Sequence, residues 1–250
     1  MLDNNIVTLI GARGQSKRIP NKNIKYLGKH PLVAYSIMTG MQLKYPVYVS
    51  SDSSLILDIA KSYGANTILR PKEYATDDSL DIEWLTHAIK EIENEENKTI
   101  ATIILLRPTT PIRDILIVKK AISIFDKRAT SLRSVEPLKE AIEKSLTIKN
   151  GYLIPSYPFE WLPISPYFED ELKEKYKTDD LTILPNQVYT TSYMANGYID
   201  ILRTKILFSK SLYGDKVQAF ATERTIDIDT IEDFKLAELL IKEKYDKYKI

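Results

Sequence analysis

Short apolar runs rich in β-branched residues alternate with amphipathic stretches through the first half of the chain. The apolar runs predict strands over Asn5–Ile10, Pro46–Ser50, Asn66–Leu69, Ala101–Arg107 and Thr130–Val135. The stretches between them predict helices over Leu32–Leu43, Ser53–Tyr63, Ser79–Glu93 and Asp114–Phe125, with Ser53 and Ser79 as N-caps. This alternation is typical of βαβ units around a parallel sheet, so the expected fold class is α/β.

The alternation stops after about Pro137. From Pro155 to Pro185 the chain has five prolines and no clear apolar period, which indicates an excursion from the sheet that serves as an interaction arm or a lid. Strands are expected again over Tyr198–Leu202 and Val217–Ala221, followed by a helix from Ile231 to about Lys247. We find no internal repeat, and we expect a single domain over residues 1–250 with an inserted arm at about 138–190.

Composition narrows the possible partners. In 250 residues, 35 Lys and Arg stand against 34 Asp and Glu, so the net charge of +1 provides no global field for nucleic acid or an anionic membrane, and neither is an expected partner. The chain has no cysteine, which excludes disulfides, thiolate zinc sites and cysteine nucleophiles, and suits the cytoplasm. The apolar run near the N-terminus is too short for a signal peptide or membrane span, so we expect a cytoplasmic protein.

The loop after the first predicted strand, from Gly11 to Asn23, concentrates positive charge. No Asp or Glu occurs between residues 4 and 51, where the cations are Arg13, Lys17, Arg18, Lys22, Lys25, Lys29 and Lys44. Open α/β sheets bind ligands at this end of their strands, and two of only eight glycines, Gly11 and Gly14, stand here. We interpret the loop as a phosphate site without the Walker or Rossmann pattern; the alternative is a solvated basic loop.

A second candidate is the segment from Thr225 to Thr230, Thr-Ile-Asp-Ile-Asp-Thr. In an extended segment its alternation puts Asp227 and Asp229 on one face, where two carboxylates make a hard oxygen site suited to Mg²⁺. The alternative is that Asp229 or Thr230 simply caps the terminal helix.

A third candidate follows the central strand, where Arg107 and Arg113 flank a turn stiffened by Pro108 and Pro111. One of these arginines is a candidate for binding a carboxylate or phosphate, and a surface ion pair is the alternative. Asp52 and Arg70 also follow predicted strands, and each taken singly is better explained by a structural role.

Together these motifs resemble the CMP-sialic acid synthetase-like (acylneuraminate) cytidylyltransferases. The resemblance covers nearly the whole chain and follows the family's order, through Ala12-Arg13, Ser16-Lys17, Lys22-Asn23, Ser51-Asp52, Leu69-Arg70-Pro71, Leu106–Arg113, Asn196-Gly197 and Ile226–Thr230. It implies a three-layer α/β/α sandwich with a mostly parallel Rossmann-like sheet of the nucleotide-diphospho-sugar transferase type. It also implies a homodimer in which an inserted arm reaches the partner's active site.

The implied reaction transfers CMP from CTP to the anomeric hydroxyl of a nonulosonic or related 2-keto-3-deoxy sugar acid, with release of pyrophosphate, for cell-surface glycan biosynthesis. By position the catalytic residues would be Arg13, Lys22, Asp227 and Asp229, the two aspartates binding Mg²⁺. The nucleotide-binding residues would be Ala12, Arg13, Ser16, Lys22, Asn23, Asp52 and Arg70. The sugar-binding residues would be Arg107, Thr109 and Asn196.

The chain departs from the family pattern on the sugar side. Many members have glutamine at the position of Arg107 and glycine at that of Arg18, and the usual Arg-Pro before Asn196 is here Met194-Ala195. Asp200 replaces a common tyrosine. Two alternatives therefore accompany the cytidylyltransferase hypothesis: a nucleotidyltransferase that uses another nucleotide and a sugar phosphate, and a nucleotide-sugar binding protein without turnover.

Overall fold

The computed structural model describes residues 5–156, 171, 173–177 and 181–248, and the chain divides into two compact units. One unit comprises residues 1–135 and 195–250, and the other comprises residues 136–194. The first unit contains every candidate site residue named above except Met194.

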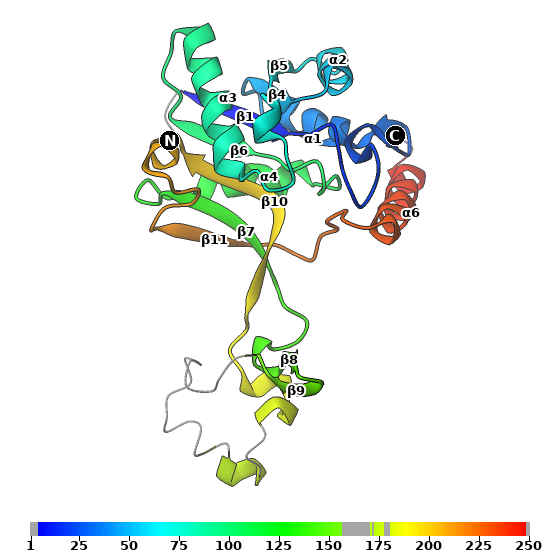
Figure 1. The fold of residues 1–250 in the computed structure, drawn as a ribbon, viewed down its shortest axis with the longest axis vertical. Helices are drawn as coiled ribbons and strands as arrows, with labels where there is room; N and C mark the ends of the chain where they lie inside the picture. The colour runs from blue at the N-terminus through cyan, green and yellow to red at the C-terminus, as the bar shows by residue number, and fades with distance from the viewer. Residues whose placement is uncertain (1–4, 157–170, 172, 178–180, 249–250) are drawn as a thin grey trace. The chain divides into compact units, whose positions relative to one another are not determined.

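Seven described strands of the chain form a mixed sheet in the order β11-β7-β10-β6-β1-β4-β5 (Figure 1). They are β1 (Ile6–Gly11), β4 (Val47–Ser51), β5 (Asn66–Leu69), β6 (Thr102–Leu105), β7 (Ser131–Pro137), β10 (Tyr193–Arg203) and β11 (Val217–Ala221). The pairs of β1 with β4 and β6, of β4 with β5, and of β7 with β11 are parallel, whereas β10 is antiparallel to β6. The predicted α/β class with a mostly parallel sheet is confirmed.

Five helices accompany this sheet in the described part of the chain: α1 (Leu32–Met41), α2 (Ser54–Ser62), α3 (Asp81–Glu96), α4 (Ile115–Ile124) and α6 (Ile231–Tyr248). Each lies within a few residues of its predicted range. Ser53 is the N-cap residue of α2, but Ser79 does not cap α3. The N-cap is Leu80, whose N–H donates to Glu83 (2.7 Å), while the Ser79 hydroxyl donates to the carbonyl of Glu73 (2.9 Å) and stabilises the preceding turn.

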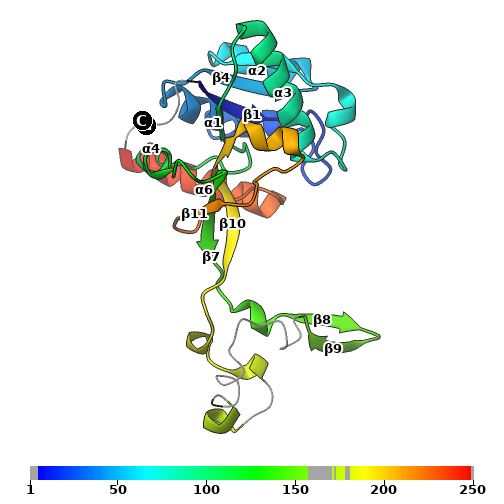
Figure 2. The ribbon, with the colours of Figure 1, turned by 90° about the vertical axis from the view of Figure 1, so that its left-hand side faces the viewer.

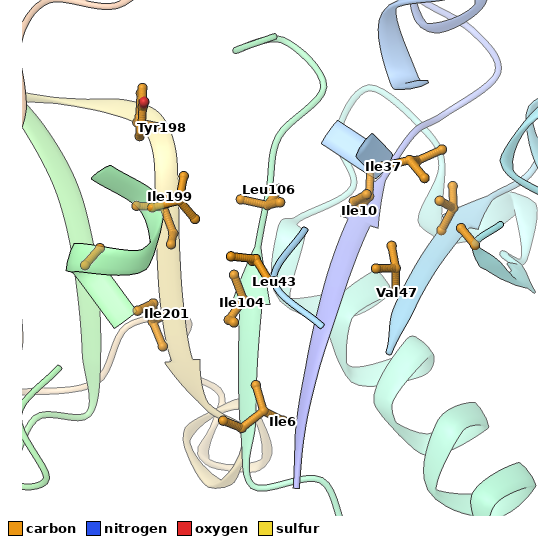
Figure 3. Close-up of a cluster of buried hydrophobic side chains, with 14 of the residues drawn as sticks. Ile6, Ile10, Ile37, Leu43, Val47, Ile104, Leu106, Tyr198, Ile199 and Ile201 are labelled. Carbon is orange, nitrogen blue, oxygen red and sulfur yellow. The ribbon is translucent and has the colours of Figure 1, made fainter. Parts of the chain in front are cut away.

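Alternate side chains of the strands build a separate core on each face of the sheet. Ile6 and Ile10 of β1 pack with Ile104 of β6 on the face of the sheet that α1, α2 and α4 cover. Figure 3 shows these side chains together with Ile37 of α1. Val7 and Leu9 pack on the other face against α3. Figure 2 shows α1 and α3 on opposite sides of β1, so the sheet is the middle of three layers.

The second unit has its own small elements, which the sequence pattern did not predict. Strands β8 (Leu146–Lys149) and β9 (Tyr152–Pro155) form an antiparallel hairpin, and a small cluster is centred on Leu184 and Tyr189. The hairpin exposes large apolar side chains, with Ile148 74% and Tyr152 77% exposed. The short hairpin of β2 (Tyr26–Leu27) and β3 (His30–Pro31) in the first unit was not predicted either.

The buried guanidinium of Arg113 joins the loop after β6 to β10 and α1. It donates to the main-chain carbonyls of Tyr198 (2.7 Å), Arg107 (2.8 Å) and Gly197 (3.2 Å), and to the hydroxyl of Ser36 (3.1 Å). Burial lowers the pKa of Arg113 to about 9, because neutral acceptors replace only part of its hydration. Arg113 is therefore neither the ligand-binding arginine nor the surface ion pair that the sequence suggested.

Replacing Arg113 by lysine tests this structural role. One ammonium cannot reach acceptors that the planar guanidinium contacts from several sides, so the Arg113→Lys variant is expected to lose about 3 kcal/mol of unfolding free energy. Urea denaturation measures the loss. Arg128→Lys is the control, because Arg128 is exposed and forms an ion pair with nearby Asp126, and it is expected to change stability by less than about 0.5 kcal/mol. Equal losses in the two variants would contradict the role of Arg113.

Candidate active site

Two clefts adjoin at the carboxyl ends of the parallel strands. The larger has a volume of about 650 Å³ and is lined by Arg13, Gln15, Ser16, Lys17, Pro20, Asn21, Asp52, Lys72, Ala75, Thr76 and Asp77. The smaller, of about 200 Å³, is lined by Gly11, Arg13, Ser16, Lys22, Asn23, Arg70, Asp81, Trp84, Leu105, Arg107, Pro108 and Thr109. Arg13 and Ser16 line both clefts, so the basic loop after β1 joins them.

Asp77 pairs with two of the cations of the larger cleft, Arg13 and Lys17. Its carboxylate lies 2.9 Å from Arg13 Nη1 and 2.6 Å from Lys17 Nζ, and Arg13 also donates to the carbonyl of Thr76 (3.1 Å). The hydrogen bond from Lys17 lowers the pKa of Asp77. This acid lies after β5, far from the basic loop in sequence, and was not among the predicted site residues. The acidic pair Asp77-Asp78, shortly after Arg70-Pro71, is the signal that could have pointed to it.

Lys22 and Ile228 connect the basic loop to the segment that carries the paired aspartates. The Lys22 ammonium donates to the carbonyl of Ile228 (2.8 Å) and lies 3.5 Å from Asp229 Oδ1, while Arg18 lies 2.9 Å from Asp229 Oδ2. The Ile228 N–H donates to the carbonyl of Thr109 (2.7 Å). Burial lowers the pKa of Lys22, and the nearby Asp229 carboxylate opposes that shift.

The burial of this segment follows the predicted alternation, although the segment is not part of a sheet. Ile228 is fully buried in a cluster with Phe234 of α6, whereas Asp227 is exposed and Asp229 half-buried. Thr230 and Asp233 cap the helix reciprocally, since the Thr230 hydroxyl accepts from the Asp233 N–H (3.2 Å) and Asp233 accepts from the Thr230 N–H (2.8 Å). Thr230 therefore fulfils the capping alternative, and neither Asp227 nor Asp229 needs its carboxylate for it.

These two carboxylates fit a hard divalent cation. Within the described residues Asp227 has no hydrogen-bond or ion-pair partner, and Asp229 is occupied only by cations. No group of three or more Asp, Glu, His or Cys suited to a metal occurs in the described part of the chain. Mg²⁺ is commonly bound by one or two carboxylates, with waters and substrate phosphates completing its shell, so a two-carboxylate donor set meets its need.

The protein's own side chains crowd the two glycines of the basic loop. A Cβ on Gly11 would lie 2.6 Å from the Trp84 ring, and one on Gly14 would lie 3.0 Å from Ser53 Cβ. The Gly14 N–H donates to Asp52 (2.7 Å). Neither glycine has a positive φ, so a left-handed turn is not what selects them. Asp52 thus shapes the loop from the end of β4 and also lines the larger cleft.

Arg70 is a buried wall of the smaller cleft. It donates from Nε to the Ser50 hydroxyl (3.1 Å) and from Nη2 to the Ser50 carbonyl (2.9 Å), and its guanidinium stacks 4.5 Å from the Trp84 ring centroid. Burial lowers the pKa of Arg70 to about 10. Trp84 comes from α3, and the sequence pattern identified it only as a helical residue.

Arg107 forms the polar part of the smaller cleft together with Asp81. Its Nη2 lies 2.7 Å from Asp81 Oδ2, and Trp84 Nε1 donates to Asp81 Oδ1 (2.9 Å). Asp81 and Asp200 raise the pKa of Arg107 even though its burial acts in the opposite direction. The site residue Asp81, at the start of α3, was missed from the sequence, where only its spacing of three from Trp84 was available as a signal.

Of three further predicted site residues, Asn23 lines the smaller cleft, whereas Ala12 and Asn196 line neither cleft. Asn23 is buried in the smaller cleft, and its side chain donates to the carbonyl of Arg13 (2.9 Å). Ala12 is buried, and its N–H donates to the carbonyl of Ser50. Asn196 is also buried, donates to the hydroxyl of Thr222 (2.7 Å) and lines neither cleft.

Comparison with known proteins identifies relatives of this chain. A family model described as cytidylyltransferase matches residues 7–150, more than half of the chain. The N-acylneuraminate cytidylyltransferase of Escherichia coli O18:K1:H7 is 29% identical over 98% of this chain and 54% of its own length, so the chain spans about half of that relative. The CMP-N,N'-diacetyllegionaminic acid synthase of Legionella pneumophila is 30% identical over 95% of this chain and 96% of its own length.

A solved structure shares the fold at low sequence identity. CMP:2-keto-3-deoxy-manno-octonic acid synthetase complexed with CTP superposes with a TM-score of 0.67 and 14% identity, over 96% of this chain and all of that one. At this identity the match supports the three-layer architecture alone. The family model matches more than half of this chain, and the Legionella relative is similar over nearly its full length. The chain therefore belongs to the cytidylyltransferase family.

Proposed function

We propose that this protein transfers CMP from CTP to the anomeric hydroxyl of a nonulosonic or related 2-keto-3-deoxy sugar acid and releases pyrophosphate. One observation carries the proposal: cations from the loop after β1 line two adjoining clefts, and Lys22 and Arg18 of the same loop contact Asp229, which, like Asp227, is not needed to cap α6. Nucleotidyl transfer needs in-line positioning and charge neutralisation at the phosphates, and this set of side chains can supply both without a covalent nucleophile.

The triphosphate is proposed to lie against Arg13, Lys17 and Lys22. In the structure these cations hold Asp77 and Asp229, so each already sits where an anion is stabilised. A triphosphate would compete with Asp77 for Arg13 and Lys17, with charge-assisted hydrogen bonds of the same kind. Ser16 and Asn23, with Asp52 and Arg70, are proposed to bind the rest of the nucleotide, while Ala12 would contribute through packing because its N–H is already used.

Asp227 and Asp229 are proposed to hold Mg²⁺. When bound, the cation would neutralise phosphate charge and lower the pKa of the attacking hydroxyl. Lys22 and Arg18 hold the Asp229 carboxylate in place, and the Ile228 peptide, bonded to Thr109 and Lys22, ties the segment to the wall of the smaller cleft.

The acceptor is proposed to occupy the smaller cleft near Arg107 and Thr109. Attack by the anomeric oxygen forms the new P–O bond at the α-phosphorus, the bond to the β-phosphate breaks, and pyrophosphate leaves as the hydroxyl proton is lost. Asn196 lines neither cleft, so its proposed contribution is to hold β10 in place through Thr222.

The second unit is proposed to be a dimerisation arm, within the range of about 138–190, of a cytoplasmic homodimer that makes CMP-sugars for cell-surface glycans. The exposed apolar hairpin of β8 and β9, with Ile148 and Tyr152 at its surface, supports this proposal, because isolated hairpins with apolar faces need a partner surface. In the described part of the chain no helix is both long and apolar enough to cross a bilayer.

Neutralising either paired aspartate should lower turnover strongly while leaving the fold intact. Asp227→Asn and Asp229→Asn are each expected to lower kcat by about 100-fold or more, because charge stabilisation at the phosphates is a large catalytic contribution. Pyrophosphate release with CTP and Mg²⁺ measures it, and urea denaturation should show a change of less than about 1 kcal/mol. Asp215→Asn, at an exposed site elsewhere, is the control; activity unchanged in both test variants would rule out the metal assignment.

Nucleotide preference separates the proposed reaction from one that uses another nucleotide. CTP is expected to raise Tm more than UTP, GTP or ATP, since a ligand at 100 times its Kd adds about 2.7 kcal/mol to stability. Differential scanning fluorimetry at equal concentrations makes the comparison. A larger shift with another nucleotide would contradict cytidylyl transfer, and a CTP shift without pyrophosphate release would favour the binding protein.

The proposed dimer has its own test. Light scattering after size exclusion is expected to give twice the chain mass of 28.7 kDa. Ile148→Asp should move the protein toward the single-chain mass, because it places a charge on the apolar hairpin, whereas Lys149→Asp on the same strand should have less effect. A single-chain mass for the unmodified protein would contradict the proposal.

A further inference from the structure

Asp200 is a buried carboxylate that the proposed reaction does not use. It lies on β10 with only 3% of its surface exposed. In the ladder between β10 and β6 it stands opposite Leu105, two residues before Arg107. Strand pairing therefore places this acid beneath the polar wall of the smaller cleft.

The surroundings of the Asp200 carboxylate are polar but incompletely bonded. Its Oδ2 accepts from the Tyr213 hydroxyl (3.2 Å) and lies 3.5 Å from Arg107 Nη2. Its Oδ1 lies 3.9 Å from Arg133 Nε, and within the described residues neither of these two buried atoms has a hydrogen-bond partner. The Arg133 guanidinium stacks on the Tyr213 ring, 4.2 Å from its centroid.

This arrangement is costly for the fold. Burial raises the pKa of Asp200, and the charges of Arg107 and Arg133 offset only part of that shift. Buried ion pairs with incomplete hydrogen bonding are often no more stabilising than apolar residues of the same volume. A network of Asp81, Asp200, Arg107 and Arg133 at the base of a cleft is therefore better explained by the orientation that it imposes than by stability.

The orientation concerns Arg107. Its Nη2 is placed between carboxylates from two different elements, Asp81 of α3 and Asp200 of β10. Gly197 of β10 also approaches its stem closely, since a Cβ there would lie 3.2 Å from Arg107 Cδ. Arg107 and Asp81 line the smaller cleft, whereas Asp200 does not.

We propose that Asp200 is a positioning residue that holds Arg107 against the cleft wall, where Arg107 and Asp81 together bind a neutral polar substituent of the acceptor sugar. The inference rests on the proposed function and specifies its acceptor. Two acids, Asp81 and Asp200, lie against the one positive charge of Arg107, so the site offers little net attraction for the acceptor's carboxylate. A donor beside an acceptor complements an amide or a hydroxyl, each of which both donates and accepts.

The experiment is a double-mutant cycle with two acceptors that differ only in whether one amino group is acylated. Asp200→Asn keeps the shape of the side chain and removes its charge. It is expected to raise KM for the acylated acceptor about 10-fold, because a tenfold change corresponds to the loss of one hydrogen bond to a charged group. KM for CTP should not change. In an Arg107→Gln background the same substitution should have no further effect on that KM, because Asp200 acts through Arg107.

Tyr213→Phe removes only one hydroxyl beneath the network and is the second variant, in case Asp200→Asn does not fold. It should shift acceptor KM in the same direction by a smaller factor, and again only when Arg107 is present. Asp215→Asn is the matched control for loss of an acid.

The possible outcomes distinguish the positioning role of Asp200 from the proposed function. Additive effects of Asp200→Asn and Arg107→Gln, or equal rises in KM for CTP and acceptor, would overturn the positioning role while leaving the proposed function in place. An acceptor preference set only by its carboxylate would overturn the substituent specificity. Failure of the unmodified protein to release pyrophosphate from CTP with any acceptor would overturn the proposed function, and this inference with it.

Discussion

The active-site architecture depends on the burial of one charged side chain, Arg113. A guanidinium in the interior must have its N–H groups accepted, and here the acceptors are carbonyls of the loop after β6 and of β10, together with the Ser36 hydroxyl on α1. Those contacts fix the main chain at Arg107 and at Gly197. The cleft wall, the position of Arg107 and the course of β10 beneath it are consequences of the same constraint.

A second constraint is charge balance between segments that are distant in sequence. The basic loop after β1 contains no acid, yet its cations are paired with Asp77 from the loop after β5 and Asp229 from the segment before α6. Each cation that is proposed to bind the triphosphate is therefore already paired with a carboxylate of the chain itself. This keeps a dense group of cations compatible with a folded state, because like charges at close range would otherwise repel each other.

The wall of the smaller cleft is organised by a different balance. Arg107 and Asp200, two positions at which the sequence departs from the pattern that it resembles, are neighbours in the fold and carry opposite charges. Without Arg107 the buried Asp200 would lose the nearer of its two neighbouring cations, so the two differences are better understood as one change than as two.

The sequence by itself determined the fold class, most of the strands and helices, and the alternation that buries Ile226 and Ile228 away from Asp227 and Asp229, because these depend on local periodicity. It did not determine which charges meet. The interpretation of the basic loop as unbalanced missed Asp77. Neither the anion-binding role nor the surface ion pair considered for Arg113 matches its buried contacts, and Asp81 and Trp84 were not recognised as part of the site. Only the tertiary structure decided these points, because each depends on contacts between segments tens to hundreds of residues apart, which leave no periodic trace in the chain.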